Sequence, residues 1–351
     1  MKNYFKVFLI AIYALMILSI SHAQNNRVST LKGIVTDKDT GNPLEASSVY
    51  FTQTTIGTTV KKSGQFLLEV PKPGNYELVV SMIGYELQQK TIYIEPGKEY
   101  KYHFKLSPKA IPLNPVEIVG EDREEWRKNL KIFKYKFLGN LAAADSCTSD
   151  NLEYLNFEWK GRFLIAKTDR PITVVNKYLG YKVVCELLHF EYNTNTRVFA
   201  CYIIPLFIEL VPKNEDQKNE WLANRKKSYL GSPEHFLKSL IKNTLNDEGF
   251  KVYHVTGIGN YDQQYISSVY GWEDIKYEGE VFDNPAIYFE NYLRIKYKRT
   301  ELSYVYQRYT YSVIDRNGIA DNNPPFIYFG FWTRNGVANL LPRDYLFEDK
   351  F

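Results

Sequence analysis

Histidine and cysteine are scarce in this sequence, and the short motifs that carry enzyme chemistry are missing. Only five of the 351 residues are histidine, and no His-x-x-Glu or His-Glu-x-x-His arrangement occurs. Zinc enzymes usually draw two ligands from such a motif, so the pattern gives no support for a zinc site. The sequence also has no Gly-x-Ser-x-Gly turn, no phosphate-binding loop and no Gly-x-Gly-x-x-Gly. We therefore expect no catalytic residue, no metal ligand and no cofactor-binding residue of a familiar kind.

The number and the positions of the three cysteines do not favour a disulfide framework. Because their number is odd, at least one of Cys147, Cys185 and Cys201 has no partner within the chain. Cys185 and Cys201 lie on neighbouring β-like runs, and a hairpin centred on Thr194 would place Cys185 opposite Ile203 instead. We expect buried, free thiols, with a disulfide between Cys185 and Cys201 as the alternative.

Long apolar runs are absent except at the N-terminus. Two lysines precede an apolar run over residues 7–20, and small residues at Ser21 and Ala23 precede Gln24. This order is typical of a secretory signal peptide cleaved between Ala23 and Gln24, with an uncleaved anchor helix as the alternative. The run is shorter than the ~20 residues of a membrane-spanning helix, so we expect no transmembrane span after cleavage. Gln24, in place of Cys, removes the usual lipoprotein attachment point.

A large excess of charge of one sign is also missing. The formal net charge is +4 and falls to +2 when Lys2 and Lys6 leave with the signal peptide. A nearly neutral chain gives no electrostatic case for binding nucleic acid. What is abundant is tyrosine, with 29 residues. Tyrosine suits half-buried strands, so β structure is the first interpretation, and a ring-lined surface for a sugar or a protein is the second.

The first part of the mature chain has the pattern of a β-sandwich. Seven strand-like segments are separated by short turns of Gly, Pro, Asn, Ser and charged residues. They cover residues 30–37, 47–53, 57–60, 64–70, 76–82, 87–94 and 100–106. Seven strands in about eighty residues indicate a seven-stranded antiparallel sandwich.

This part also resembles a known family. The stretch GIVTDKDTGNPLEASSVYF and the segments after it resemble the carboxypeptidase-regulatory-like domain, a transthyretin-like sandwich common in exported Bacteroidetes proteins. The matching positions are Gly33, Asp37, Gly41, Pro43, Leu44, Gly57, Gly64, Gly84 and Tyr85. The resemblance implies a scaffold or attachment module and no chemistry.

The Asp-rich first turn also has a weak similarity to a calcium-binding loop. Asp37, Asp39 and Gly41 have some of the required spacing, but the further oxygen ligands and the distal Glu are missing. Asp and Asn favour such turns through local bonds to backbone N–H groups. We therefore expect a structural turn.

The composition then changes at a proline-rich stretch. Pro108, Pro112 and Pro115 indicate an extended linker. The 328 residues left after signal removal are too many for one ordinary core, so two domains are expected. The predicted organisation is a signal peptide at 1–23, a sandwich at 24–107, a linker at 108–120 and a second domain at 121–351.

The second domain should mix helices and strands. Trp126, Leu130, Phe133, Phe137 and Leu141 recur every three or four residues, which predicts a helix with one buried face. The expected strands cover residues 161–167, 172–176, 180–192, 197–210, 250–256, 287–298, 302–315 and 326–331. The domain is therefore interpreted as α+β, with its helices on one side of an antiparallel sheet.

Two more helices are expected between these strands. Residues 215–227 are highly charged, with Trp221 as the buried candidate. In the second helix Ser232 is the expected cap, Pro233 the first residue and Gly249 the terminator. Its expected apolar face is formed by Phe236, Leu237, Leu240 and Ile241.

Several blocks of this second domain resemble a large Bacteroidetes group known only as carboxypeptidase-like regulatory domain-containing proteins. The blocks include EWRKNLKIFKYKFLGN, PITVVNKYLGYKVVCELLHFEY and GFWTRNGVANLLPRDY. No activity follows from this resemblance. It implies export and the two-domain architecture.

Together these observations favour a non-enzymatic, exported envelope protein. It would be periplasmic, associated with the outer membrane, or secreted, and it would bind or scaffold a protein or a glycan. One alternative is a hydrolase with an unfamiliar site in residues 121–351, for example a Cys201–His189 pair assembled in space. Another is a structural or assembly component of the envelope.

Overall fold

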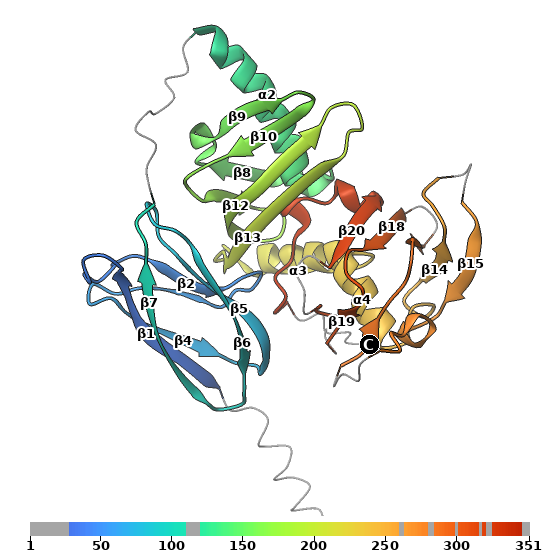
Figure 1. Cartoon of the computed structure of the whole chain (residues 1–351), viewed down its shortest axis with the longest axis horizontal. Helices are drawn as coiled ribbons and strands as arrows, with labels where there is room; N and C mark the ends of the chain where they lie inside the picture. The colour runs from blue at the N-terminus through green and yellow to red at the C-terminus, as the bar shows by residue number, and fades with distance from the viewer. Residues whose placement is uncertain are drawn as a thin grey trace, which may run out of the picture. The chain divides into compact units, whose positions relative to one another are not determined.

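The computed structural model describes residues 28–109, 120–259, 263–279, 284–298, 301–315, 318–320 and 325–345. The chain divides into two units, residues 1–115 and 116–351 (Figure 1). The predicted signal peptide with its Ala23–Gln24 cleavage site, and residues 110–119 of the predicted linker, lie outside the described residues. No helix among the described residues combines the length and the apolar character needed to cross a membrane.

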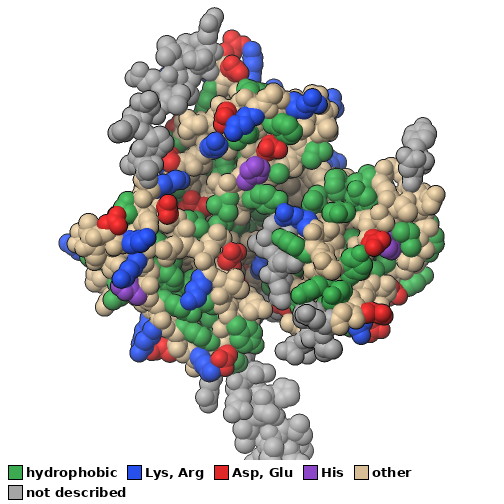
Figure 2. Space-filling view, in the orientation of Figure 1, with side chains coloured by type: hydrophobic (Ala, Val, Ile, Leu, Met, Phe, Trp, Pro, Cys, Tyr) green, Lys and Arg blue, Asp and Glu red, His purple; other side chains and the backbone are tan. Residues whose placement is uncertain are grey.

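The first unit is the predicted seven-stranded sandwich. Its strands are β1 (Ser29–Asp37), β2 (Ser48–Phe51), β3 (Gly57–Thr59), β4 (Gln65–Val70), β5 (Gly74–Ser81), β6 (Gln88–Ile94) and β7 (Glu99–Leu106). One sheet has the order β4-β1-β7 and the other β3-β2-β5-β6, and a shared core fills the space between them. Figure 2 shows charged side chains of both signs mixed over this unit. All seven predicted strands are confirmed.

One pair of strands in the sandwich differs from the expected antiparallel arrangement. β1 and β7 are parallel, with Thr30 opposite Glu99 and Asp37 opposite Leu106. A parallel pair needs a long crossover connection, and strands β2 to β6 supply it. Strand periodicity in the sequence carries no information about this direction.

The second unit contains two main antiparallel sheets, where the sequence had suggested one. The six-stranded sheet comprises β8 (Cys147–Asp150), β9 (Asn156–Lys160), β10 (Phe163–Lys167), β11 (Ile172–Asn176), β12 (Tyr181–Asn193) and β13 (Phe199–Glu209). The five-stranded sheet comprises β14 (Phe250–Val255), β15 (Tyr265–Val269), β17 (Tyr292–Tyr297), β18 (Glu301–Gln307) and β20 (Phe326–Gly330). The short strands β16 (Ala286–Ile287) and β19 (Ser312–Val313) pair separately. The mainly β, α+β class is confirmed.

Helix α2 (Gly120–Leu138) packs on the six-stranded sheet, as Figure 1 shows. Phe133 and Phe137 are buried in the core of that sheet, and the indole Nε1 of Trp126 donates to the Leu155 carbonyl at 2.8 Å. The predicted helix extended to Leu141, but it ends earlier because Gly139 adopts a φ of 88°. Leu141 instead precedes the 3₁₀ helix η2 (Ala142–Ser146).

Helix α3 (Glu215–Tyr229) is capped by Asn214 and contributes the expected buried Trp221. It also buries Arg225 and Tyr229, which its charged composition did not suggest. The Arg225 guanidinium donates to the Leu179 carbonyl at 2.8 Å and to the Glu209 carboxylate at 2.9 Å. A buried charge is tolerated when it is paired in this way.

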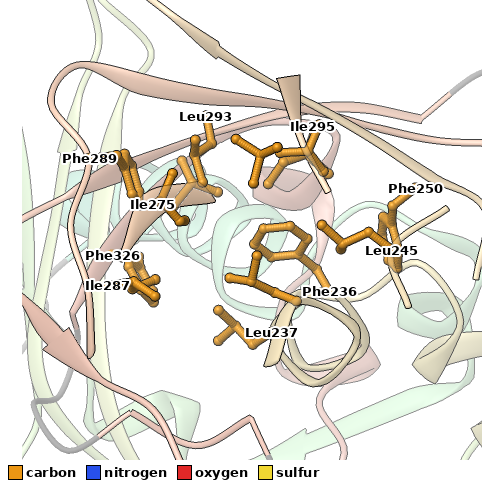
Figure 3. Packing of buried hydrophobic residues seen from close by; sticks show 14 of the residues in the cluster. Phe236, Leu237, Leu245, Phe250, Ile275, Ile287, Phe289, Leu293, Ile295 and Phe326 are labelled. Atoms are coloured by element: carbon orange, nitrogen blue, oxygen red, sulfur yellow. The ribbon is translucent and has the colours of Figure 1, made fainter. Parts of the chain in front are cut away.

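Helix α4 (Pro233–Ile241) begins as predicted, with Ser232 accepting the N–H of His235 and Pro233 in the first turn. Its apolar residues enter the core beneath the five-stranded sheet, where Figure 3 shows Phe236 and Leu237 among the strand residues. The helix ends at Ile241, well before Gly249, because Asn243 takes the left-handed conformation that commonly ends helices. Further 3₁₀ helices among the described residues are η3 (Leu152–Tyr154), η4 (Trp272–Ile275), η5 (Phe331–Arg334) and η6 (Val337–Asn339).

The three cysteines are free, as expected, but only Cys185 is buried, whereas Cys147 and Cys201 are partly buried. The predicted hairpin register is off by two residues. Cys185 faces Pro205, and Leu187 faces Ile203, because the turn is centred later than Thr194. Burial raises the pKa of the Cys201 thiol to about 12 and also raises the pKa of the Cys185 thiol. A thiol that stays protonated is a poor nucleophile.

Candidate functional site

The five-stranded sheet has one face covered by α4 and one face lined by tyrosines. Strand alternation places Leu293 and Ile295 of β17 in the core with α4. The intervening residues Tyr292 and Arg294 therefore point to the opposite side. The register across the sheet extends this second face over all five strands.

We call this second surface the tyrosine face. One row across it runs Ser268, Tyr253, Arg294, Tyr304 and Phe329. The next row runs Tyr265, Val255, Tyr292, Tyr306 and Ile327, and a third contains Lys251, Lys296 and Leu302. Five tyrosines and one phenylalanine thus share one sheet surface.

Most rings of the tyrosine face are partly accessible, while Tyr304 is buried at 6% exposure, and neighbouring rings contact each other. Tyr265 is 63% exposed and Tyr306 40%. The ring centroids of Tyr253 and Tyr265 lie 6.0 Å apart, and those of Tyr292 and Tyr306 lie 5.6 Å apart. Figure 2 shows hydrophobic side chains, a class that includes tyrosine there, gathered over the part of the unit that holds β18 and β20. Exposed aromatic surface of this kind is typical of binding sites.

The charges on the tyrosine face are all positive. Its strand positions carry Arg294, Lys251 and Lys296 and no carboxylate. Within the described part of the chain, none of the three forms a salt bridge, and the buried Nε of Arg294 has no hydrogen-bond partner. A buried donor without a partner is unusual in a folded protein and calls for an explanation such as a ligand or an ordered water.

A small pocket opens at this part of the face. It is lined by Tyr253, Val255, Gln263, Tyr265 and Arg294, and its volume is about 170 Å³. Ligand pockets for whole drug-sized molecules are larger, at roughly 300–1,000 Å³. The pocket therefore suits one chemical group of a larger ligand that lies across the sheet.

The Asp-rich turn of the first unit is held together by its own hydrogen bonds. One carboxylate oxygen of Asp37 accepts the N–H groups of Asp39 at 2.9 Å and Thr40 at 2.7 Å. The Tyr85 hydroxyl donates to the other oxygen at 2.9 Å. Two positions of the family resemblance, far apart in sequence, therefore meet here. The bonds hold Asp37 in a structural turn.

The other family positions also shape turns or close contacts. A side chain at Gly33 would overlap the Tyr102 carbonyl, and one at Gly64 would meet the Val35 carbonyl. Gly41 and Gly84 have positive φ angles. Gly57 starts β3, Pro43 forms a bridge with Thr36, and Leu44 is buried in the sandwich core.

We predict that the Asp37 turn makes the sandwich acid-sensitive. The Thr40 N–H and the Tyr85 hydroxyl hold the pKa of Asp37 below its usual range, and the carboxylate in turn raises the pKa of Tyr85. Because the folded pKa is lowered, the stabilisation is present above the unfolded value of about 4 and is lost as pH falls through the folded pKa.

The test compares the wild type, Asp37→Asn and the control Asp39→Asn from about pH 7 down to about pH 3. Denaturant-dependent hydrogen exchange in peptides from β1 and β7 reports on the sandwich alone. Asp37→Asn should be less stable than the wild type at neutral pH, and the difference should shrink on acidification. A constant difference across this range would contradict the prediction.

The four histidines that the structure describes lie in four separate places. His103 bonds to Thr36 at 2.9 Å, and His254 bonds to the Glu290 carbonyl. His235 is buried, and its Nδ1 accepts the Gly231 N–H at 3.0 Å. Its neutral ring therefore carries the proton on Nε2, which lies 3.1 Å from the Glu248 carboxylate. The contact between His235 and Glu248 stabilises the start of α4.

The Cys201–His189 pair considered for a hydrolase is not assembled. Cys201 pairs with Phe190 and shares its side of the sheet, which faces the core. His189 pairs with Tyr202 and points to the other side, where it is exposed. Among the described residues, no group of three His, Cys, Asp or Glu side chains is arranged to hold a metal ion.

The sequence did not single out the tyrosine face, although its signal is present. In β17, Tyr292 and Arg294 alternate with core residues, and in β18, Tyr304 and Tyr306 do the same. Each of these two strands therefore has two aromatic or basic residues on the side away from the core. Only the register of five strands shows that these positions form one surface.

Comparison with known proteins identifies the first unit. Residues 31–118, about a quarter of the chain, match the CarboxypepD_reg-like domain. No curated protein matches the sequence.

Similar solved structures are distant. They include a cohesin-X-dockerin complex from Acetivibrio cellulolyticus (16% identity, 29% of this chain and 73% of that chain, TM-score 0.21). Others are a candidate carbohydrate-binding protein from Bacteroides uniformis (9%, 52% and 79%, TM-score 0.20) and a DUF3823 family protein from Parabacteroides merdae (12%, 53% and 82%, TM-score 0.19). TM-scores this low support no conclusion about fold or function. The family match covers all but the first two residues of the seven-stranded sandwich, so residues 31–118 of this chain are a CarboxypepD_reg-like domain, as their motifs predicted.

Proposed function

We propose that this protein is exported and acts as a non-enzymatic binding or scaffolding protein of the cell envelope. In this proposal the signal peptide directs export, the CarboxypepD_reg-like sandwich is an attachment module, and the second unit binds a glycan or a protein. The observation that supports the binding role is the tyrosine face with Arg294, which forms no salt bridge to any residue that the structure describes.

Aromatic and arginine side chains are the types that recognition surfaces favour. Tyrosine and arginine dominate binding hot spots because they bury large areas and still offer polar groups. Tyr265, Tyr306 and Ile327 of the tyrosine face are exposed enough to make such contacts. The rigid five-stranded sheet holds them in fixed positions, which lowers the entropy lost on binding.

The proposal is tested by capture from the intact envelope of the native host. Immobilised protein starting at Gln24 should retain an envelope component, and Tyr265→Ser/Tyr306→Ser should reduce that retention by at least tenfold. The matched control is Tyr93→Ser, because Tyr93 is 60% exposed on β6 of the sandwich. Retention that survives the double substitution would contradict a binding role for this face.

N-terminal sequencing of the endogenous chain is a separate test of export. The endogenous chain recovered from the envelope fraction should begin at Gln24, since small residues are correctly placed before that position. Recovery of a chain that begins at Met1 would remove the export part of the proposal.

A further inference from the structure

We propose that the ligand of the tyrosine face is an acidic polysaccharide whose uronate carboxylate pairs with Arg294. Sugar rings on either side of that carboxylate stack on the neighbouring tyrosines. The inference rests on the proposed binding function and deepens it by naming the ligand class.

The first argument is charge complementarity. Arg294, Lys251 and Lys296 lie on one surface with no carboxylate at its strand positions. Arg294 stands in the middle strand of the sheet, so its charge is central. A ligand without negative charge would leave the guanidinium uncompensated when it covered the face.

The second argument is the shape of the guanidinium. Its planar fork matches a carboxylate with two parallel hydrogen bonds, which a lysine ammonium cannot form. Arg294 has no salt-bridge partner among the described residues, and its Nε is buried without a hydrogen-bond partner. The pocket of about 170 Å³ that Arg294 lines with Tyr253 and Tyr265 has room for one such acidic group.

The third argument is the placement of rings around the charge. Tyr253 and Tyr304 are the direct cross-strand neighbours of Arg294, and of these two only Tyr253 is partly exposed, because Tyr304 is buried at 6%. Tyr265 and Tyr306 lie in the next row and are more exposed. The electron-rich faces of such rings attract the slightly positive C–H groups of a sugar ring, so a chain of sugars can lie flat across the sheet.

The low density of positive charge on the tyrosine face favours a uronate polymer over single-stranded nucleic acid as the ligand. Grooves that track a phosphate backbone rely on extended positive potential. Here three cations lie on the face and the whole chain has a formal net charge of only +4. Carboxylates spaced along a sugar polymer match this sparser charge.

Affinity electrophoresis of the chain from Gln24 tests the inference. Native gels contain polygalacturonate, alginate, hyaluronate or heparosan, and two further gels contain carboxyl-reduced polygalacturonate or poly(dT). At least one uronate polymer should retard the wild type. Arg294→Gln should weaken that retardation at least tenfold and Arg294→Lys partly, while the exposed Arg162→Gln should leave it unchanged. Thermal melts confirm that each variant is folded.

Each other outcome overturns the inference. No retardation by any of the four uronate polymers, or equal retardation of Arg294→Gln and the wild type, would exclude a carboxylate at Arg294. Stronger binding to poly(dT) would assign the face to nucleic acid. Binding of the carboxyl-reduced polymer that depends on Tyr265 and not on Arg294 would overturn the acidic ligand and leave the proposed function standing. Envelope capture that is insensitive to Tyr265 and Tyr306 would remove the proposed function as well.

Discussion

Phe133→Ala should lower the free energy of unfolding of the second unit by about 3–5 kcal/mol, the usual cost of removing a buried aromatic ring. Phe133 is fully buried where α2 meets the six-stranded sheet. Its ring stacks on Phe137 at 5.0 Å and contacts Phe190 at 4.8 Å. The cavity left by alanine would therefore remove contacts to both the helix and the sheet.

The matched control for this substitution is Tyr135→Ala on the same helix. Tyr135 is 54% exposed, so its loss should change the free energy of unfolding by only about 0.5 kcal/mol. Urea denaturation followed by tryptophan fluorescence is selective, because all five tryptophans lie in the second unit. Equal midpoints for the two variants would contradict the assignment of α2 to this core.

Gly139→Ala should destabilise the same unit by about 2–5 kcal/mol, because it adds an overpacking cost to a conformational one. Gly139 ends α2 at a φ of 88°. An added Cβ would lie 2.6 Å from the Arg334 carbonyl oxygen and 2.6 Å from the Gly336 nitrogen. Both neighbours are backbone atoms and cannot rotate away.

Gly161→Ala isolates the conformational part of that cost. Gly161 also has a positive φ, of 60°, but its added Cβ would meet no atom within 4 Å. We expect a loss of about 1–2 kcal/mol from the left-handed backbone alone. Equal urea midpoints for Gly139→Ala and Gly161→Ala would contradict the close packing of the end of α2 against residues 334–336.

Local patterns in the sequence predicted the strands that face a core. In β4 the side chains of Phe66, Leu68 and Val70 are buried while the residues between them are exposed, and this alternation is legible without a structure. The start of α4 could also be predicted, because a serine cap and a first-turn proline act within one turn of the helix.

The strands that the sequence missed are β8, β9 and β15, and all three lie at sheet edges. An edge strand is short and partly solvated, so it needs little apolar alternation. β8 reads Cys-Thr-Ser-Asp, and β15 contains two adjacent serines. Hydrophobic periodicity therefore has little to detect in β8 and β15, and although β9 (Asn-Phe-Glu-Trp-Lys) does alternate, its five residues contain only two apolar positions.

Features that depend on contacts between distant parts of the chain could not be predicted from the sequence. The direction of β1 relative to β7 depends on the whole sandwich between them. The register of β12 and β13 depends on a turn later than Thr194 and on an irregularity between Leu187 and His189. The tyrosine face requires five strands in register before its rings become one surface.

The central claim is that the tyrosine face binds a component of the envelope. Its most direct test is the ratio of envelope retention between Tyr93→Ser and Tyr265→Ser/Tyr306→Ser, two variants that each remove exposed tyrosine rings, from different units. We predict a ratio of at least ten, with both variants folded in thermal melts. A ratio near one would show that exposed tyrosines on this sheet contribute nothing specific to binding and would contradict the proposed function.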